Sequence, residues 1–149
     1  MLPRMARKKV FRRASTPKVN KASVRPEEPD PRTCSASTSP VGKFCRGLPG
    51  ATADIKWGDN LMFCIGGKIF AGMQCDDPHS VGFKCDEMEF ERLTKVEGII
   101  PAPYAARFGW VKVTRAGVLK QAPLEKLIRR SYDLVRAGLP ARVRASLPG

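Results

Sequence analysis

The feature that most constrains the fold is a tight turn, Gly66-Gly67, between two segments in which apolar and polar residues alternate. A two-residue glycine connection favours a β-hairpin, because glycine readily adopts the positive φ angles that such turns need. In the flanking segments, 60–65 and 68–75, apolar side chains recur with the two-residue period of a strand that is buried on one face. The chain is therefore predicted to build an antiparallel sheet around this hairpin.

The pattern after residue 40 predicts further strands, and helices on either side of them. Period-two alternation identifies the strands, a capping box at Asp86 begins one helix, and apolar spacing of three and four residues identifies the long C-terminal helix. The expected elements are, in chain order, a short helix at 41–48, strands at 54–57, 60–65, 68–75 and 80–85, a helix at 86–95, a strand at 109–114, and helices at 124–138 and 140–147.

Alternation also assigns side chains to the core. Ile69, Ala71 and Met73 share one side of their strand and are expected to face the helices. Trp57 and Phe70 lie beside lysines in the sequence, but large aromatic side chains in strands are more often buried than exposed. Both are therefore expected in the core.

The basic residues are concentrated at the two ends of the chain, whose net charge is +13. Residues 1–40 hold ten basic and three acidic side chains, residues 41–114 hold nine of each, and residues 115–149 hold eight and two. A strongly basic protein favours polyanionic partners. No apolar run approaches the roughly 20 residues of a membrane helix, so no membrane contact is expected.

The N-terminal residues 1–40 are expected to form a disordered basic arm, because they contain several prolines and almost no periodic apolar pattern. Residues 41–149 are expected to form one domain. Three interpretations of the arm stay open: basic clusters that bind nucleic-acid phosphates or serve as an import address, an organelle transit peptide in a eukaryote, and a gene model that starts too early.

The cysteines and the single histidine do not predict a reactive or metal site. Five irregularly spaced cysteines without a C-x-x-C pair imply neither a disulfide framework nor a zinc site, which favours a reducing, cytoplasmic location. Cys75 and His79 could share a metal, but a solvated turn histidine is favoured about ten to one. No catalytic motif is present. We therefore expect no cofactor, no metal and no enzymatic activity.

A basic surface is predicted on the two C-terminal helices. Its members lie opposite the apolar seam of the long helix or on the short helix that follows, where they could neutralise phosphates without reading sequence. The alternative is an ordinary solvated helix face. The residues are Lys126, Arg129, Arg130, Arg136, Arg142 and Arg144.

A second candidate surface combines strand lysines with an unusual proline-rich loop. Lysines beside aromatic residues on a sheet are typical of surfaces that contact nucleic acid, and the prolines stiffen a loop whose aromatic neighbours could line a groove. The alternative, which is favoured, is that Tyr104 and Trp110 pin the loop to the domain. The lysines are Lys56, Lys68 and Lys84, with Lys112 beside them, and the loop residues are Pro101, Pro103, Tyr104, Arg107 and Trp110.

Seven short strings, in order across about a hundred residues, resemble the MmcQ/YjbR family. The resemblance implies an α+β fold similar to the frataxin homologue CyaY, in which an antiparallel β-meander is packed by helices on one face. This arrangement is sometimes described as a double wing, and the family is usually labelled DNA-binding. The strings are Leu48-Pro49-Gly50, Lys56-Trp57-Gly58, Gly67 to Ala71, Phe83-Lys84-Cys85, Pro101 to Tyr104, Trp110-Val111 and Ser131 to Val135.

The sequence therefore predicts a monomeric, non-enzymatic module that binds DNA without sequence preference, mainly through phosphates. The first alternative is a protein-interaction or scaffold domain with no nucleic-acid role. The second is a frataxin-like metal-binding protein, which is less favoured because the first helix carries Lys43 and Arg46 instead of carboxylates. The acidic cluster at 86–91 lies at a helix start, where carboxylates complement the helix dipole without a metal.

Overall fold

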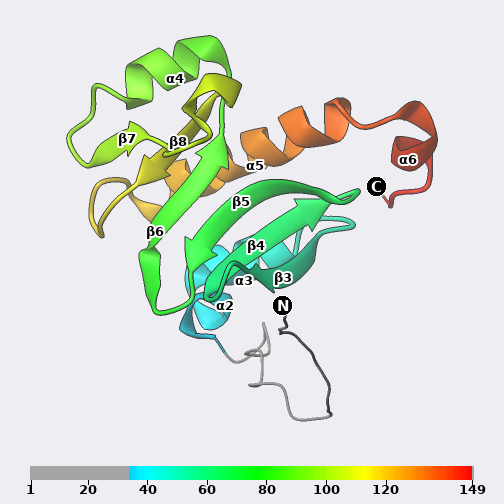
Figure 1. The fold of residues 1–149 in the computed structure, drawn as a ribbon, viewed down its shortest axis with the longest axis horizontal. Coiled ribbons are helices and arrows are strands. Elements are labelled where there is room, and N and C mark those ends of the chain that lie inside the picture. Colours follow the sequence, from blue (N-terminus) through cyan, green and yellow to red (C-terminus); the bar gives the residue numbers. More distant parts are fainter. Residues whose placement is uncertain (1–33, 149) are drawn as a thin grey trace, which may run out of the picture.

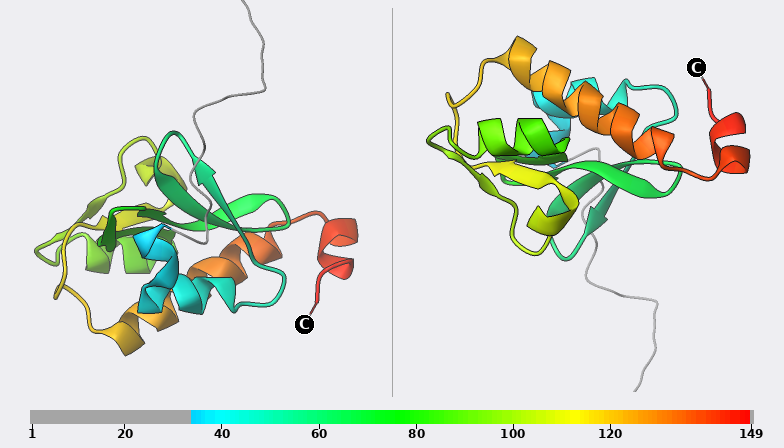
Figure 2. Two further views of the ribbon diagram at one scale, coloured as in Figure 1. Left: turned by 90° about the horizontal axis from the view of Figure 1, so that it is seen from below. Right: turned by 90° about the horizontal axis from the view of Figure 1, so that it is seen from above.

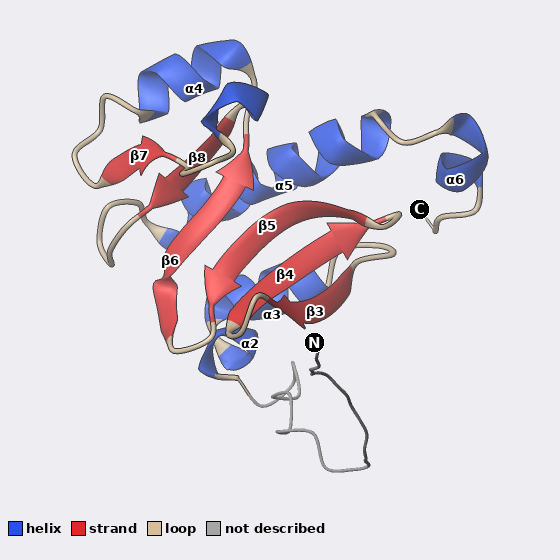
Figure 3. Ribbon diagram, viewed as in Figure 1, coloured by secondary structure: helices blue, strands red, loops and turns tan. Residues whose placement is uncertain are grey.

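A computed structural model describes residues 34–148 and shows an α+β fold of two layers, as predicted (Figure 3). All neighbouring strands pair antiparallel, in the order β3-β4-β5-β6-β8-β7. The first four strands therefore form the predicted meander (Figure 1). The strands are β3 (Thr52–Lys56), β4 (Asn60–Ile65), β5 (Lys68–Gln74), β6 (Asp77–Lys84), β7 (Ile99–Pro101) and β8 (Trp110–Val113).

The helices cover one face of this sheet, whereas the β3–β4 hairpin and a 3-10 turn project from the other face (Figure 2). The helical face holds the core, in which Leu124, Ile128 and Tyr132 of the long helix are buried against the strands. In the described part of the chain no helix has the length and apolar character needed to cross a membrane. The helices are α2 (Ser35–Thr38), α3 (Pro40–Arg46), α4 (Glu87–Leu93), η1 (Ala106–Phe108), α5 (Gln121–Ala137) and α6 (Ala141–Ala145).

The folded region begins earlier than predicted. Residues 34–40 were expected in the disordered arm, but Cys34, Ala36 and Ser37 are buried and α2 packs against α3. The Ser39 hydroxyl accepts a hydrogen bond from the Gly42 amide and donates one to the Ala36 carbonyl, so the serine-rich segment forms a compact cap. The fold therefore includes seven residues, 34–40, that the predicted boundary at residue 41 placed in the arm. The rest of the predicted arm, residues 1–33, lies outside the described residues.

A bulge in β5 changes which side chains face the core. Phe63 pairs with Ala71 and Cys64 pairs with Ile69, so Phe70 is the extra residue between them. Phe70 is fully buried, as predicted, but Ile69 is only half-buried and faces away from the helices, so its assignment to the core face was wrong. Trp57 was also wrongly assigned to the core, since its side chain is 72% exposed.

The edge strand β7 was not predicted. It contains only three residues, which is too short for an alternating pattern to be recognised. It also ends at Pro101, which cannot donate a backbone hydrogen bond and therefore argues against a strand in the sequence. It pairs with β8 at the edge of the sheet, and the other predicted strands and helices are confirmed within a few residues.

A buried serine joins the two layers where two strands separate. β5 and β6 pair from Ala71 and Phe83 onward, and at the open end of this pair the Ser131 hydroxyl of α5 accepts a hydrogen bond from the Lys84 amide at 2.9 Å. The same hydroxyl donates to the Phe70 carbonyl at 2.6 Å. Ser131 therefore replaces hydrogen bonds that the strands do not make with each other.

Replacing this hydroxyl should destabilise the domain. In Ser131→Ala the part-buried Lys84 amide and the buried Phe70 carbonyl lose this partner, so we expect the free energy of unfolding to fall by about 2 kcal/mol in urea titrations. Ser146→Ala, in which an exposed hydroxyl is lost, should change it by less than about 0.5 kcal/mol. Equal stability of both variants would contradict the role given to Ser131.

Candidate functional site

The sheet face opposite the helices carries a wide, open groove of about 1310 Å³. One wall is the β3–β4 turn with Trp57, and the other is the 102–105 loop with η1. Figure 2 shows the two backbone segments projecting from the sheet face opposite the helices. Leu134 and Val135 of α5 close the groove where β5 and β6 separate. Because the helices occupy the other face, nothing in residues 34–148 covers this groove.

Two glycines lie side by side in the centre of the groove floor, of which Gly82 is open and Gly72 is covered by the Met62 side chain. The strand register aligns Met62, Gly72, Gly82 and Lys112 in one row across β4, β5, β6 and β8. A Cβ atom on Gly82 would lie 3.5 Å from the nearest heavy atom, so a side chain there would be tolerated. Glycine inside a strand often marks a place where a ligand approaches the backbone.

All the charged side chains that line the groove are positive. Its lining contains four lysines and no aspartate or glutamate, although residues 41–114 contain equal numbers of basic and acidic side chains. None of the acidic residues of this region lines the groove, although Asp54 lies next to it, beside Lys56. The four lysines are Lys56, Lys68, Lys84 and Lys112.

The four lysines differ in their local contacts. Lys84 donates to the Phe108 carbonyl at 2.9 Å, and Lys56 lies 4.0 Å from the exposed carboxylate of Asp54. Considering residues 34–148, Lys68 and Lys112 make no ion pair. These two ammonium groups are the best placed to bind an anion.

Aromatic side chains stand on the rim of the groove. Trp57 and Phe108 are mostly exposed and Tyr104 is fully exposed, while Trp110 is half-buried in the lining. Tyr104 therefore does not pin the proline-rich loop to the domain, and this part of the sequence interpretation was wrong. The loop is held instead by backbone hydrogen bonds, including one from the Ala102 amide to the Trp110 carbonyl.

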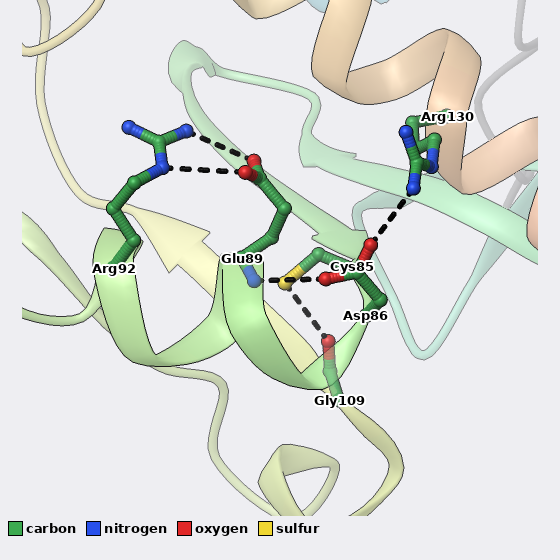
Figure 4. Close-up of polar contacts among 6 residues, drawn as sticks. All are labelled: Cys85, Asp86, Glu89, Arg92, Gly109 and Arg130. Carbon is green, nitrogen blue, oxygen red and sulfur yellow. Dashed lines mark hydrogen bonds and ion pairs between the residues drawn. The ribbon is translucent and has the colours of Figure 1, made fainter.

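The predicted basic surface on α5 lies on the other side of the molecule from the groove. Lys126, Arg129 and Arg130 are exposed, as the helical spacing predicted. However, Arg129 pairs with Asp133 at 3.3 Å, and Arg130 pairs with Asp86 at the start of α4 at 2.9 Å (Figure 4). These ion pairs reduce the positive charge that the helix presents to solvent.

Two further arginines of this surface bind the protein itself. Arg136 donates to the Tyr132 hydroxyl at 3.2 Å and to the Pro148 carbonyl at 3.1 Å. Arg144 donates to the carbonyls of Ala137 and Leu139 at 2.9 and 2.8 Å. Both guanidinium groups therefore fasten the C-terminal segment to the end of α5.

The structure places the predicted site residues in three groups. Lys56, Lys68, Lys84, Pro103, Tyr104 and Trp110 come together in the groove. Pro101 is exposed in the edge strand β7. The guanidinium carbon of Arg107 lies 4.8 Å from the centroid of the Phe108 ring, and Arg107 lines a smaller, separate pocket. Lys126 and Arg142 remain on the helical side with the arginines described above.

Sequence reasoning missed the floor and part of the rim. Gly72 and Gly82 each lie in the middle of a predicted strand, and an interior glycine was the available signal for a close approach to the backbone. Met62 and Phe108 gave no local signal, because their positions depend on the neighbouring strand and on the turn η1.

Comparison with known proteins agrees with this architecture. A family model described as YjbR matches residues 46–134, which is more than half of the chain. This chain belongs to the YjbR family. The resemblance drawn from the seven strings is therefore confirmed.

Two solved structures share the fold of this YjbR-family chain. A Deinococcus radiodurans protein with a DUF419 domain is 24% identical, with a TM-score of 0.64, and the match covers 72% of this chain and 88% of that chain. A Pseudomonas syringae protein is 21% identical, with a TM-score of 0.53, and the match covers 62% of this chain and 93% of that chain. No curated protein matches the chain.

The thiols of this YjbR-family domain are poorly suited to nucleophilic chemistry. Burial, together with the nearby carboxylates of Asp86 and Glu89, raises the pKa of Cys85 to about 11 (Figure 4). Burial likewise raises the pKa values of Cys45 and Cys75 to about 12. At neutral pH these groups are protonated, and thiols are much weaker nucleophiles than thiolates.

Metal ligands are not gathered in the described region. Within residues 34–148, no group of three or more histidine, cysteine, aspartate or glutamate side chains could hold a metal ion. His79 is exposed in β6, and its amide donates to the Asp77 carboxylate at 3.3 Å.

The raised thiol pKa values lead to a prediction about modification. All five cysteines are buried, so at pH 8 we expect the native protein to react with a disulfide reagent at least about 100-fold more slowly than the unfolded protein, which should expose five thiols. The measurement is the absorbance of the released chromophore over time. Ser146→Cys, which adds a surface thiol, should react rapidly, and fast reaction of the unaltered native chain would contradict the assignment.

Proposed function

We propose that this domain is a DNA-binding module that holds the phosphate backbone in the lysine-lined groove of its sheet. Membership of the YjbR family suggests a small, non-enzymatic domain. The observation that carries the proposal is the segregation of charge: four lysines and no carboxylate line the groove, within a region that is neutral in total. Such a surface is complementary to a polyanion.

The residues of the groove account for how DNA would be held. Lysine ammonium groups neutralise phosphates and release condensed counterions, which gives affinity without sequence preference. Gly82 leaves room for a bulky chain above the middle of the sheet, whereas the Met62 side chain occupies the space above Gly72. Lys68 and Lys112 lie at two places along the groove, so one strand of backbone could contact both.

The helical surface is the weaker candidate for the same function. Four of its six basic side chains already contact carboxylates, carbonyls or a hydroxyl of the domain. Exposed ion pairs would have to be exchanged for phosphate contacts, which lowers the net gain. Of its members, Lys126 and Arg142 alone make no polar contact within residues 34–148.

The groove lysines should control DNA binding. In the full chain, we expect the double variant Lys68→Gln with Lys112→Gln to bind a labelled DNA roughly tenfold more weakly at about 100 mM salt. The slope of log affinity against log salt should fall by about 2, because two phosphate contacts are lost. Fluorescence anisotropy at salt concentrations from about 50 to 200 mM measures both quantities.

The control removes the same charge from the other side of the domain. The double variant Lys126→Gln with Arg142→Gln loses two charges without breaking a contact in the described region, and it should bind DNA almost as the unaltered chain does. If this control weakened binding as much as the groove variant, the helical surface or net charge alone would explain the affinity, and the groove would lose its role.

Filling the floor of the groove tests its shape independently of charge. We expect Gly82→Val to keep or slightly increase thermal stability, because a Cβ atom there makes only ordinary van der Waals contacts and valine favours strands. DNA affinity should nevertheless fall severalfold, since the side chain occupies the space between Gly72 and Lys112. Thr52→Val, on the exposed edge strand β3 outside the groove, is the matched control. Unchanged affinity in Gly82→Val would contradict the proposed path.

A protein partner is the second candidate, because the groove also exposes apolar side chains, among them Met62, Trp57 and Phe108. Exposed apolar groups of this size often mark protein interfaces. Binding to a protein through these groups would depend little on salt. The salt series that measures DNA binding therefore separates the two functions.

A further inference from the structure

Two aromatic residues on the rim of the groove have a backbone conformation that aromatic residues rarely adopt. Within residues 34–148, Trp57 with φ of 52° and Tyr104 with φ of 66° are the only residues other than glycine with positive φ. Both side chains line the groove, and both are largely or fully exposed to solvent. Residues held in such conformations cluster at functional sites.

The β3–β4 turn would be less strained without its tryptophan. Trp57 and Gly58 are consecutive residues with positive φ, an arrangement that favours asparagine followed by glycine. The next hairpin of the same sheet uses Gly66 and Gly67, with φ of 59° and 83°, which removes this strain. The turn itself therefore does not explain a tryptophan at position 57.

The loop at the other wall shows the same departure. The Ala105 amide donates to the Ala102 carbonyl at 3.2 Å, which closes a β-turn with Pro103 in its second position and Tyr104 in its third. Positive φ at the third position is the pattern of a type II turn, which favours glycine or asparagine there. Because Tyr104 is fully exposed, no packing against the core offsets its strain.

We infer that the groove takes single-stranded DNA, with unpaired bases stacked on Trp57 and Tyr104 and phosphates held by the lysines between them. This inference rests on the proposed function and adds the form of the nucleic acid. Aromatic rings presented beside a basic groove are the parts from which single-strand sites are built, because every base has a flat face that can stack. In a duplex the bases already stack on one another, so the two rings could contact only the sugar-phosphate backbone.

The two turns also restrain the backbone positions from which the rings project. Pro103 restricts the backbone before Tyr104, and Gly58 allows the tight turn after Trp57. A rigid turn at each wall holds its ring near the groove before the ligand arrives, which lowers the conformational entropy that binding must remove. The strand of DNA would run between the two walls across Gly82 and the Met62 side chain that covers Gly72.

The test measures affinity and stability in the same variants. With the full chain at about 100 mM salt, we expect Trp57→Asn and Tyr104→Asn each to weaken binding of a labelled oligothymidine by about tenfold. Affinity for a duplex of the same length should change less than about twofold. Because asparagine suits both turns, the melting temperature should stay constant or rise by about 2–6 °C.

A matched control loses an exposed apolar side chain elsewhere. Met88 on α4 is 82% exposed and lies outside the groove, so Met88→Asn should leave both affinities unchanged. Tryptophan fluorescence gives an independent readout: oligothymidine should quench the unaltered chain more strongly than Trp57→Asn, in which Trp110 alone remains.

The outcomes separate this inference from the proposed function. Duplex affinity equal to or above single-strand affinity, together with unchanged binding in both asparagine variants, would overturn the single-strand inference and leave phosphate binding in place. No salt-sensitive binding to either DNA would overturn both. Weaker oligothymidine binding with an equal or higher melting temperature would support the inference, since loss of folding could not be its cause.

Discussion

The hydroxyl of Ser131 is the contact on which the arrangement of the two layers depends. It accepts from the Lys84 amide and donates to the Phe70 carbonyl at the place where β5 and β6 stop pairing. The strands can separate there because the serine satisfies their backbone groups. The ring of the next residue, Tyr132, packs edge-on against the Phe70 ring, with 5.4 Å between the ring centroids. The Tyr132 hydroxyl donates a hydrogen bond to the Pro49 carbonyl. One helix turn thus fixes both the sheet opening and the position of α5.

This arrangement gives the two kinds of basic side chain different tasks. On the helical side, arginines bind carboxylates and backbone carbonyls, for which a planar group with several donors is well suited. On the sheet side, lysines surround a groove without carboxylates, and a compact ammonium group suits phosphate contact without fixed geometry. Several of the basic residues in the C-terminal region therefore stabilise the fold, although their helical positions alone indicate only exposure to solvent.

The groove itself combines residues that strands and turns ordinarily avoid. Glycines occupy the centre of β5 and β6, and aromatic residues occupy turn positions that glycine or asparagine would take without strain. Departures from local preference are most informative when they converge on one surface, because real proteins break such rules chiefly at functional sites. Here they converge on the face that no helix covers.

The sequence by itself determined the strands of the meander, the α4 and α5 helices and the family, because two-residue and three-to-four-residue periods and short turn signals are local. Tertiary structure decided which residues face the groove. The bulge at Phe70 reversed the facing of Ile69, and residues 34–40 joined the fold through packing of α2 on α3. Arg130 meets Asp86 from 44 positions away. Contacts between distant residues leave no periodic signal, so only the folded chain could show that the lysines gather apart from the arginines.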